Sequence, residues 1–509
     1  MIHPASTSLA NKKVLVLGLG QTGAASARWL ARSGAVVRLL DTRELPPGAV
    51  ELCQQLGHSI DLKHFGEHEP DGRLFDGLDL VIVSPGLVPG IDPVAGWLER
   101  SRTAGASVIG EIELFALAIK ELKEQSGYSP RILGVTGTNG KTTVTALTRL
   151  MCDVAGMKAK AAGNISPAAL DALMEAIDNA ALPDVWVLEL SSFQLMTTYS
   201  LDLEAAVVLN VTQDHLDWHG DMQSYCQAKA RILEMAKIKV VNRDDPLVLM
   251  MVEGLDRQDV RSFGASVPEF VNDLGLEFQQ DIAWLASCES LEFDDQPIKT
   301  RRRKNEANQP RQPGRLVRLM PADALPLVGR HNVMNVLAAA ALVRSFGTGW
   351  TSILKAATEY QGEPHRMRFV RTIREVDFFD DSKGTNVGAT VAGIEGLGRP
   401  LVLIAGGLGK GQDFEPLGKT MAAAGAKAVL IGADADKIKS ALDKYGVPSC
   451  MAQDMQEAVT RAFEWAMPGQ AVVLSPACAS FDMFKSYGHR GDVFTSEVHE
   501  LALSLGDVA

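Results

Sequence analysis

The sequence lacks several features that define whole classes of protein. No apolar run approaches the roughly 20 residues that a membrane-spanning helix needs. Residues 1–10 contain no basic stretch followed by an apolar one, which is how a secretory signal begins. The six cysteines are scattered, without the CxxC spacing of zinc or redox sites. We therefore expect a cytoplasmic protein with reduced thiols and no membrane insertion.

An excess of positive charge is also missing. The formal net charge is −12, and general binding to nucleic acid depends on cations that neutralise phosphates. We expect no nucleic-acid partner, although local basic sites on an acidic protein can still bind small anions. One basic run, residues 301–304 with Arg311 and Arg315, lies among Asn, Gln and Pro and is interpreted as a solvated loop without assigned function.

The chain of 509 residues is too long for one hydrophobic core, which indicates about three domains. Apolar strands alternate with helical stretches, a pattern typical of α/β domains with parallel sheets. Expected strands are residues 13–20, 35–40, 78–83, 185–190, 205–210, 401–405, 428–431 and 471–474, and expected helices are 24–33 and 332–345. Residues 121–130 are interpreted as a polar linker, and residues 267–315 as β-hairpins with a loop.

The first glycine loop, Gly18-Leu-Gly-Gln-Thr-Gly23, stands between an expected strand and an expected helix, and Asp41 closes the next strand. This pattern is typical of a dinucleotide site, where backbone N–H groups hold a diphosphate and a carboxylate holds a ribose. Taken alone, the loop leaves NAD and other nucleotides open, because any nucleotide diphosphate uses the same contacts. A tight turn without a ligand is a third interpretation.

The second glycine loop also follows a strand and opens a helix. It consists of Gly137, Thr138, Asn139, Gly140, Lys141, Thr142 and Thr143. Glycines free backbone N–H groups for phosphate, Lys141 supplies a cation, and the Thr142 hydroxyl suits Mg²⁺. Val135 stands where the strict P-loop motif has its first glycine, so an ordinary kinase or GTPase is a poorer match. The loop predicts ATP binding, with a chance turn as the alternative.

Two further side chains are expected at the same sheet edge. Glu189 lies near the end of the apolar strand 185–190, and His215 follows the strand 205–210. Ligands of open α/β sheets bind at the carboxyl ends of the strands, and a carboxylate at a buried strand end is usually functional or paired. Glu189 is therefore a candidate Mg²⁺ ligand, while His215 alone is as readily structural as a ligand.

The order of the motifs carries a resemblance. GTNGKTT is followed by ELSSFQL (189–195), NVTQDHLD (210–217), GRHNVMNVLAA (329–339), HR (365–366), DSKGTN (381–386) and LSPACASFDMF (474–484). This set resembles the Mur ligases over nearly the whole chain, and only residues 267–315 lack a recognisable motif. The DSKGTN and SPACAS stretches favour the D-glutamate-adding branch of that family.

The resemblance implies a fold and an activity. The fold would be α/β with a Rossmann-like N-terminal domain (1–128) for the UDP-substrate, a central P-loop ATPase-like domain (129–327), and a C-terminal Rossmann-like domain (328–509) that brings the amino acid and closes over ATP. ATP would phosphorylate the carboxylate of UDP-N-acetylmuramoyl-L-alanine, and the amine of D-glutamate would attack the acyl phosphate, in peptidoglycan precursor synthesis. The implied cofactors are ATP and two Mg²⁺ ions, the partners are these small molecules, and a monomer is expected.

The resemblance also assigns roles to particular residues. Catalysis would fall to Lys141, His215 and Lys229, and the metal ligands would be Thr142, Glu189, His215 and Lys229, the last after carbamylation by CO₂. ATP would be bound by the second loop with Asn332, Asn335, Arg366 and Asp381. The UDP-substrate would be bound by Gln21, Thr22, Asp41, Arg43, Ser84, Asn164 and Gln194. D-glutamate would be bound by Lys383, Thr385, Lys410, Ser480 and Tyr487.

Two rival functions remain open at this point. An NAD-dependent oxidoreductase would use the first loop and leave the second idle, and a nucleotide-binding scaffold would leave Glu189, His215 and Lys229 without a purpose. Without the resemblance, Lys229 is interpreted as a lysine on a helix surface. Leu408 stands where the family often has Asp, close to the implied amino-acid pocket.

Overall fold

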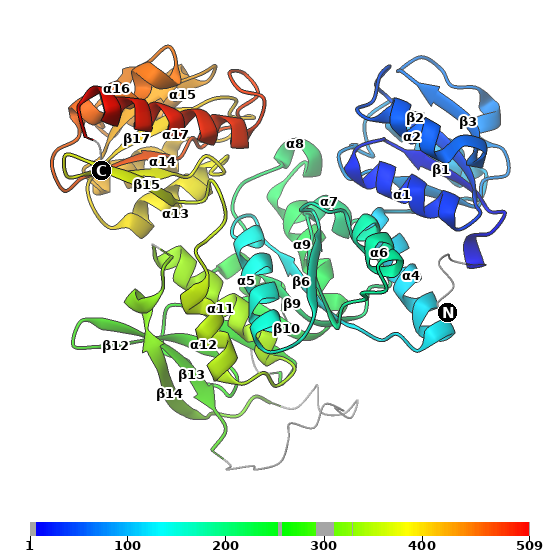
Figure 1. Ribbon diagram of the computed structural model, residues 1–509, viewed down its shortest axis with the longest axis horizontal. Coiled ribbons are helices and arrows are strands. Elements are labelled where there is room, and N and C mark those ends of the chain that lie inside the picture. Colours follow the sequence, from blue (N-terminus) through cyan, green and yellow to red (C-terminus); the bar gives the residue numbers. More distant parts are fainter. Residues whose placement is uncertain (1–6, 253–256, 292–309, 328, 508–509) are drawn as a thin grey trace.

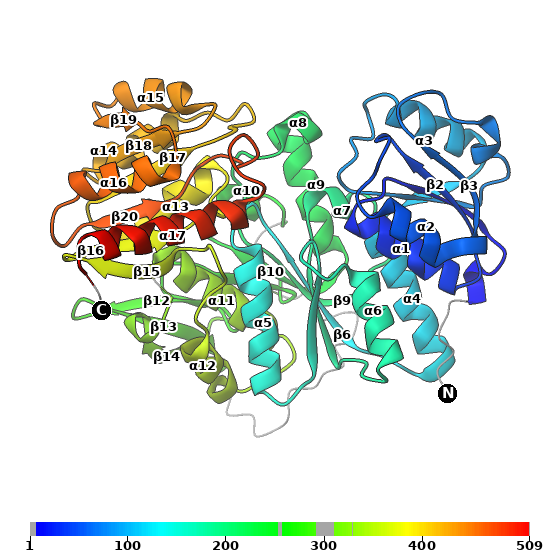
Figure 2. The ribbon, with the colours of Figure 1, turned by 45° about the horizontal axis from the view of Figure 1, so that its top comes forward.

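The computed structural model describes residues 7–252, 257–291, 310–327 and 329–507. Three β-sheets define an N-terminal lobe, a central lobe and a C-terminal lobe, coloured mainly blue, cyan to yellow-green, and yellow to red (Figure 1). The short helix α8 (Leu216–His219) projects from the central lobe between the two outer lobes in both views (Figures 1 and 2). The predicted α/β class with three domains is confirmed. Within the described ranges, no helix is long and apolar enough to cross a membrane.

The N-terminal sheet is entirely parallel, with the strand order β3-β2-β1-β4-β5. Its strands are β1 (Lys13–Leu17), β2 (Val36–Asp41), β3 (Ile60–Phe65), β4 (Leu80–Val83) and β5 (Ser107–Ile109), with helices α1 (Gln21–Arg32), α2 (Ala49–Leu56) and α3 (Val94–Thr103). The strand order reverses direction between β1 and β4, which creates a crevice at their carboxyl ends. The first glycine loop follows β1 and therefore lies at this crevice.

The central sheet has nine strands in the order β14-β13-β12-β11-β10-β9-β6-β8-β7. They are β6 (Arg131–Thr136), β7 (Ala159–Gly163), β8 (Val185–Glu189), β9 (Leu203–Val208), β10 (Ala236–Asn242), β11 (Val260–Phe263), β12 (Leu274–Gln279), β13 (Ile282–Glu289) and β14 (Arg315–Pro321). Its helices are α5 (Lys141–Val154), α6 (Ala169–Asp178), α7 (Ser192–Leu195), α9 (Met222–Glu234) and α10 (Pro246–Leu249). The strands β12, β13 and β14 pair antiparallel, as predicted for hairpins in this stretch.

Two helices that follow the central sheet pack back onto it. Helices α11 (Arg330–Arg344) and α12 (Trp350–Glu359) contact α5 and share one hydrophobic cluster with the central strands. The boundary predicted at residue 328 therefore assigns these two helices to the C-terminal domain, although they pack on the central core. The many alanines of α11 allow this close approach.

The C-terminal sheet has the order β15-β16-β20-β17-β18-β19, in which only β15 is antiparallel to its neighbour. Its strands are β15 (Arg368–Ile373), β16 (Val376–Asp380), β17 (Leu401–Gly406), β18 (Lys427–Ile431), β19 (Ser449–Met451) and β20 (Ala471–Leu474). Helices α13 (Val387–Leu397), α14 (Glu415–Ala423), α15 (Ala435–Asp443), α16 (Met455–Trp465) and α17 (Tyr487–Ser504) cover it. The loops after β16, β20 and β17 lie side by side because these strands are neighbours.

Two interpretations of polar segments are wrong. Residues 121–126 are not a linker, because α4 (Glu111–Ser126) continues through them and buries Leu122 before it ends at Gly127. Arg311 is not a solvated residue: its side chain is buried, forms an ion pair with Asp273 and lies over the ring of Phe270. The basic residues 301–304 lie outside the described residues.

Candidate active site

The second glycine loop bends tightly around the start of α5. Gly140 has a φ of 85°, and a Cβ there would lie 2.5 Å from Asn335 Oδ1, so only glycine fits without a shift. Lys141 opens α5, and its Nζ donates to the carbonyl oxygens of Gly137 and Thr138, each at 2.9 Å. Burial lowers the pKa of Lys141, although the Glu189 carboxylate partly opposes this shift. The loop thus presents a cation beside an array of backbone N–H groups.

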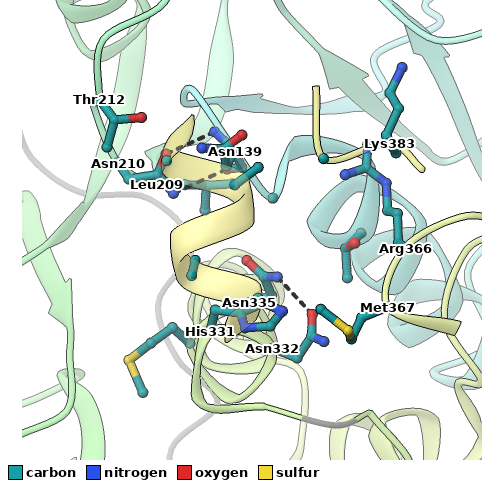
Figure 3. A pocket seen from close by; sticks show the side chains of 18 of the residues that line it. Asn139, Leu209, Asn210, Thr212, His331, Asn332, Asn335, Arg366, Met367 and Lys383 are labelled. Atoms are coloured by element: carbon teal, nitrogen blue, oxygen red, sulfur yellow. Dashed lines mark hydrogen bonds between the residues drawn. The ribbon is translucent and has the colours of Figure 1, made fainter. Parts of the chain in front are cut away.

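A pocket between the central and C-terminal lobes begins at this loop (Figure 3). It is lined by all four residues that were predicted to bind ATP beyond the loop: Asn332, Asn335, Arg366 and Asp381. Asn335 Nδ2 donates to Asn332 Oδ1 at 3.1 Å, and Arg366 and Asn139 both line the pocket. Arg366 Nη2 also donates to Thr142 Oγ1 at 2.7 Å, so the two lobes meet at a residue pair predicted to hold phosphate and metal.

Asp381 is held in place by neighbours from its own lobe. Its Oδ2 accepts from Ser475 Oγ at 2.7 Å, and its Oδ1 accepts from Met367 N at 3.1 Å. Burial, the largest influence, raises the pKa of Asp381 to about 7 against these hydrogen bonds and the Arg366 charge. Near neutral pH this carboxyl group is therefore able to accept a hydrogen bond from a hydroxyl group or, when protonated, to donate one to it.

The Glu189 carboxylate is suited to a metal ion. Glu189 ends β8 and is buried, and its Oε1 accepts from Asn164 Nδ2 at 2.9 Å. Its Oε2 is buried without a hydrogen-bond partner, and an unpaired buried oxygen is costly unless a cation or ligand satisfies it. Over the part of the chain that the structure describes, no three His, Cys, Asp or Glu side chains gather into a metal cluster. An ion at Glu189 would have to complete its shell with phosphate, hydroxyl and water oxygens, as Mg²⁺ commonly does.

Lys229 is a buried residue, which corrects its interpretation as a helix-surface lysine. It lies on α9 with 1% of its surface exposed, donates from Nζ to Gly137 O at 2.9 Å, and lies 4.5 Å from the Tyr225 ring centroid. Burial lowers the pKa of Lys229 well below its usual value, and the nearby Lys141 lowers it further. A lowered pKa favours the neutral amine, which is the nucleophilic form that carbamylation requires.

His215 lies at the same sheet edge. It adopts a left-handed φ of 55° at the start of α8, and its Nε2 is 3.6 Å from Asp214 Oδ2. Burial lowers the pKa of His215, Asp214 opposes this, and the Lys141 charge adds to the lowering. The lowered pKa favours the neutral imidazole, which is the form that can bind a metal.

Different contacts hold the N-terminal glycine loop in place. A Cβ on Gly23 would lie 1.8 Å from Gly18 O, and Ser84 Oγ donates to the same carbonyl at 2.8 Å. Asp41 accepts from Leu19 N at 2.6 Å and from Arg43 through N, Nε and Nη2. Burial would raise the pKa of Asp41, but these hydrogen bonds hold it below its usual value. The carboxylate is occupied in holding the loop and Arg43.

The remaining residues predicted to bind the UDP-substrate are divided between two places. Gln21 and Thr22 open α1 at the first glycine loop. Asn164 bonds Glu189, and Gln194 accepts from Ser191 N through Oε1 while its buried Nε2 has no partner. The structure therefore puts two of these amides in the central lobe near the metal candidate.

Residues predicted for D-glutamate lie on the three adjacent loops of the C-terminal sheet. Lys383 and Thr385 follow β16, Lys410 follows β17, and Ser480 follows β20, with Tyr487 at the start of α17. Lys383 Nζ lies 3.7 Å from the Tyr487 ring centroid, and burial lowers the pKa of Lys383 to about 8. A cation over an aromatic ring beside further polar groups suits a carboxylate ligand.

One important residue was not predicted. Asn386 Nδ2 donates to Asn139 Oδ1 at 3.1 Å and to Asp214 Oδ2 at 3.2 Å, which joins the C-terminal lobe to the second glycine loop. Asn386 closes the DSKGTN motif, so that motif contained the signal. The contact between Asn386 and Asn139 could not be predicted, because the two residues lie far apart in the sequence.

Comparison with known proteins agrees with this geometry. The chain matches the Mur ligase MurD-like N-terminal domain over residues 12–110, the Mur ligase middle domain over residues 135–343, and the Mur ligase glutamate ligase domain over residues 365–478. It is 56% identical to a UDP-N-acetylmuramoylalanine–D-glutamate ligase of Bordetella pertussis, covering 97% of this chain and 98% of that protein. It is 49% identical to a protein of the same name from Paraburkholderia xenovorans, covering 97% of each.

A solved structure supports the fold. The crystal structure of UDP-N-acetylmuramate–alanine ligase from Thermotoga maritima superposes with a TM-score of 0.54 at 17% identity, covering 96% of this chain and 99% of that one. The lobes, the phosphate loop and the sequence matches lead to one conclusion: the chain belongs to the Mur ligase family, which consists of ATP-dependent ligases.

Proposed function

We propose that this ligase joins D-glutamate to UDP-N-acetylmuramoyl-L-alanine in the cytoplasm, using ATP and releasing ADP and phosphate. The observation that carries the proposal is the cluster of charges at the second glycine loop: the charges of Glu189 and Arg366 both act on Lys141. Arg366 also bonds Thr142 and lines the pocket between the central and C-terminal lobes. High identity over 97% of the chain to ligases named for this reaction supports the choice of substrates.

The first step would transfer the γ-phosphoryl group of ATP to the carboxylate of the UDP-precursor. This reaction is mostly a matter of alignment and charge neutralisation. Lys141 and Arg366 would neutralise the phosphate oxygens, while Asn332 and Asn335 would hold the adenine side. Asp381 would bind the ribose hydroxyls, which matches a carboxyl group able to donate or accept near neutral pH.

Magnesium would complete the charge balance. Glu189 and Thr142 would hold one ion, and the unpaired Glu189 Oε2 supports this assignment. His215 and a carbamylated Lys229 would hold a second, since carbamylation converts a buried amine into an anionic oxygen ligand. When bound, the ions would draw charge from the phosphate oxygens during transfer.

In the second step, the amine of D-glutamate would attack the acyl phosphate, form the C–N bond and expel inorganic phosphate as the amine loses a proton. Lys383, Thr385, Lys410, Ser480 and Tyr487 would bind the amino acid. The N-terminal lobe would hold the UDP group through Gln21, Thr22, Asp41, Arg43 and Ser84, and Asn164 and Gln194 would approach the precursor from the central lobe. We propose that the enzyme works as a monomer.

An oxidoreductase using the first loop is a weaker candidate. In dinucleotide sites, the carboxylate at the end of the second strand accepts from a ribose. Here the Asp41 oxygens already accept from Leu19 and Arg43. A uridine carrier held by Arg43 fits this arrangement better.

The test is release of phosphate from ATP by the purified enzyme with UDP-N-acetylmuramoyl-L-alanine and a panel of amino acids. We expect turnover only when D-glutamate and the precursor are both present, and little with L-alanine, L-lysine or diaminopimelate. Turnover with another amino acid in preference to D-glutamate would refute the assigned acceptor. Reduction of NAD without ATP consumption would refute the ligase assignment itself.

A further inference from the structure

The three loops around the proposed amino-acid pocket are independent pieces of chain. We call them the β16 loop (residues 381–386), the β17 loop (407–414) and the β20 loop (475–486). Each contributes at least one residue to the pocket, so their relative positions determine its shape. Backbone hydrogen bonds link them at two points: Ala477 N donates to Gly384 O at 2.9 Å, and Leu408 exchanges hydrogen bonds with Ala479.

One side chain of the β17 loop bonds both the β20 loop and the residue that directly follows the β16 loop. Gln412 Oε1 accepts from Val387 N at 2.9 Å, immediately after the β16 loop. Gln412 Nε2 donates to Gly409 O at 3.0 Å and to Ala477 O at 3.4 Å, which reaches the β20 loop. Both ends of the amide are therefore used, and each bond ends on backbone rather than on a mobile side chain.

A second side chain joins two of these loops from the opposite side. Arg490 lies on α17 with 1% of its surface exposed. Its Nη2 and Nε donate to Ser382 O at 2.8 Å and Ser382 Oγ at 3.0 Å, and its Nη1 donates to Cys478 O at 3.1 Å. Ser382 precedes Lys383, and Cys478 lies two residues before Ser480, so the planar guanidinium fixes the spacing of two loops that carry pocket residues.

We propose that Gln412 and Arg490 are positioning residues for the incoming amino acid. Neither is assigned a contact with the substrate. They hold the β16, β17 and β20 loops in the arrangement in which Lys383, Lys410 and Ser480 face one ligand, so that the site is formed before the amino acid arrives. This inference rests on the proposed function, because it takes the three loops as the D-glutamate pocket.

The first test replaces Gln412 with methionine, which keeps the length of the side chain and removes its hydrogen bonds. We expect the KM for D-glutamate to rise about tenfold, while kcat and the KM values for ATP and the UDP-precursor stay within about twofold. Gln470→Met is the matched control, because Gln470 also accepts from a backbone N–H, that of Met467, but lies just before the amino-terminal end of β20, at the other end of the strand from the β20 loop. The control should leave all three KM values unchanged.

The second test is Arg490→Lys, which keeps the charge and loses the forked donors. We expect a rise in the KM for D-glutamate at least as large as that of Gln412→Met. Arg38→Lys is the matched control: Arg38 is also buried and bonds the carbonyl oxygens of Arg73 and Asp76, but in the N-terminal lobe. If Arg490→Lys does not fold, the Gln412 variant still tests the proposal.

The outcomes distinguish a failure of the proposed function from a failure of the positioning role. A wild-type enzyme that does not use D-glutamate refutes the proposed function. A wild-type enzyme that uses it, together with a Gln412→Met variant of unchanged KM, refutes the positioning role. A parallel loss of all three affinities with a lower melting temperature would also refute it, because that pattern marks general destabilisation.

Discussion

The two glycine loops of this enzyme use the same backbone design for different tasks. Each follows a central parallel strand, β1 or β6, and opens a helix, α1 or α5, an arrangement in which backbone N–H groups are able to bind a phosphate. Around the first loop, Asp41 and Ser84 bond the chain itself. Around the second, the charges of Glu189 and Arg366 act on Lys141, and Glu189 Oε2 has no hydrogen-bond partner. The shared backbone accounts for binding, and the neighbouring side chains account for chemistry.

The largest expected difference between the loops comes from Lys141→Ala. Loss of the cation beside the γ-phosphate should lower kcat/KM at least about a thousandfold. Binding of the UDP-precursor to the N-terminal lobe, measured by calorimetry, should stay within about twofold. Lys160→Ala, which breaks only a surface ion pair with Glu175, is the control. Loss of precursor binding in Lys141→Ala would show that the two loops are not separate sites.

Glu189→Gln should have the next largest effect. The amide keeps the shape and can still contact Asn164, but it removes the negative charge that would hold Mg²⁺. We expect kcat to fall about a hundredfold and the Mg²⁺ concentration for half-maximal activity to increase, as measured by metal titration. Glu175→Gln on the exposed face of α6 should change neither quantity. An unaltered Mg²⁺ requirement in Glu189→Gln would exclude this carboxylate as a metal ligand.

A smaller effect is expected at the first loop. Arg43→Gln removes a cation that Asp41 holds at the crevice. The KM for the UDP-precursor should rise about five- to tenfold, the size of one charge-assisted hydrogen bond, and the KM for ATP should not change. Steady-state kinetics with each substrate varied in turn measures both. A rise in the KM for ATP instead would reverse the assignment of the two loops.

The smallest effect concerns stability at the junction of the lobes that carry the two loops. Glu111 begins α4 and accepts from Leu170 N at 2.7 Å, and burial raises its pKa to about 8. The folded protein therefore binds this proton more tightly than the unfolded chain, so wild-type stability should fall as pH rises from about 4.5 to 8. Glu111→Gln keeps an acceptor and lacks the titration. As the pH rises from about 4.5 to 8, the melting temperature of Glu111→Gln should increase by a few degrees relative to that of the wild type.

The control for the stability prediction is Glu124→Gln, at the exposed end of the same helix. Its melting temperature should follow that of the wild type at every pH. A Glu111→Gln variant that also follows the wild type would show that this carboxyl group titrates normally in the folded protein.

Local features of the chain were predictable because they depend on nearby residues. The glycine loops, the apolar strands and the position of Glu189 at a strand end follow from short patterns of residue type. Which charged side chains are buried was harder to predict from the sequence. Lys229 and Arg311 were both interpreted as solvated, since a charged side chain is usually exposed, and both are buried. Their partners, Gly137 and Asp273, lie far away along the chain.

Short patterns in the chain were enough to predict the three α/β lobes, the two glycine loops and the family, because repeated strand, turn and helix patterns are local. Which side chains contact each other across the lobes depends on the tertiary structure. It brought Arg366 to Thr142 and Asn386 to Asn139 across two lobes, and it packed α11 and α12 on the central core. Such pairings depend on how sheets and helices bury their apolar faces against each other, which no short stretch of residues specifies.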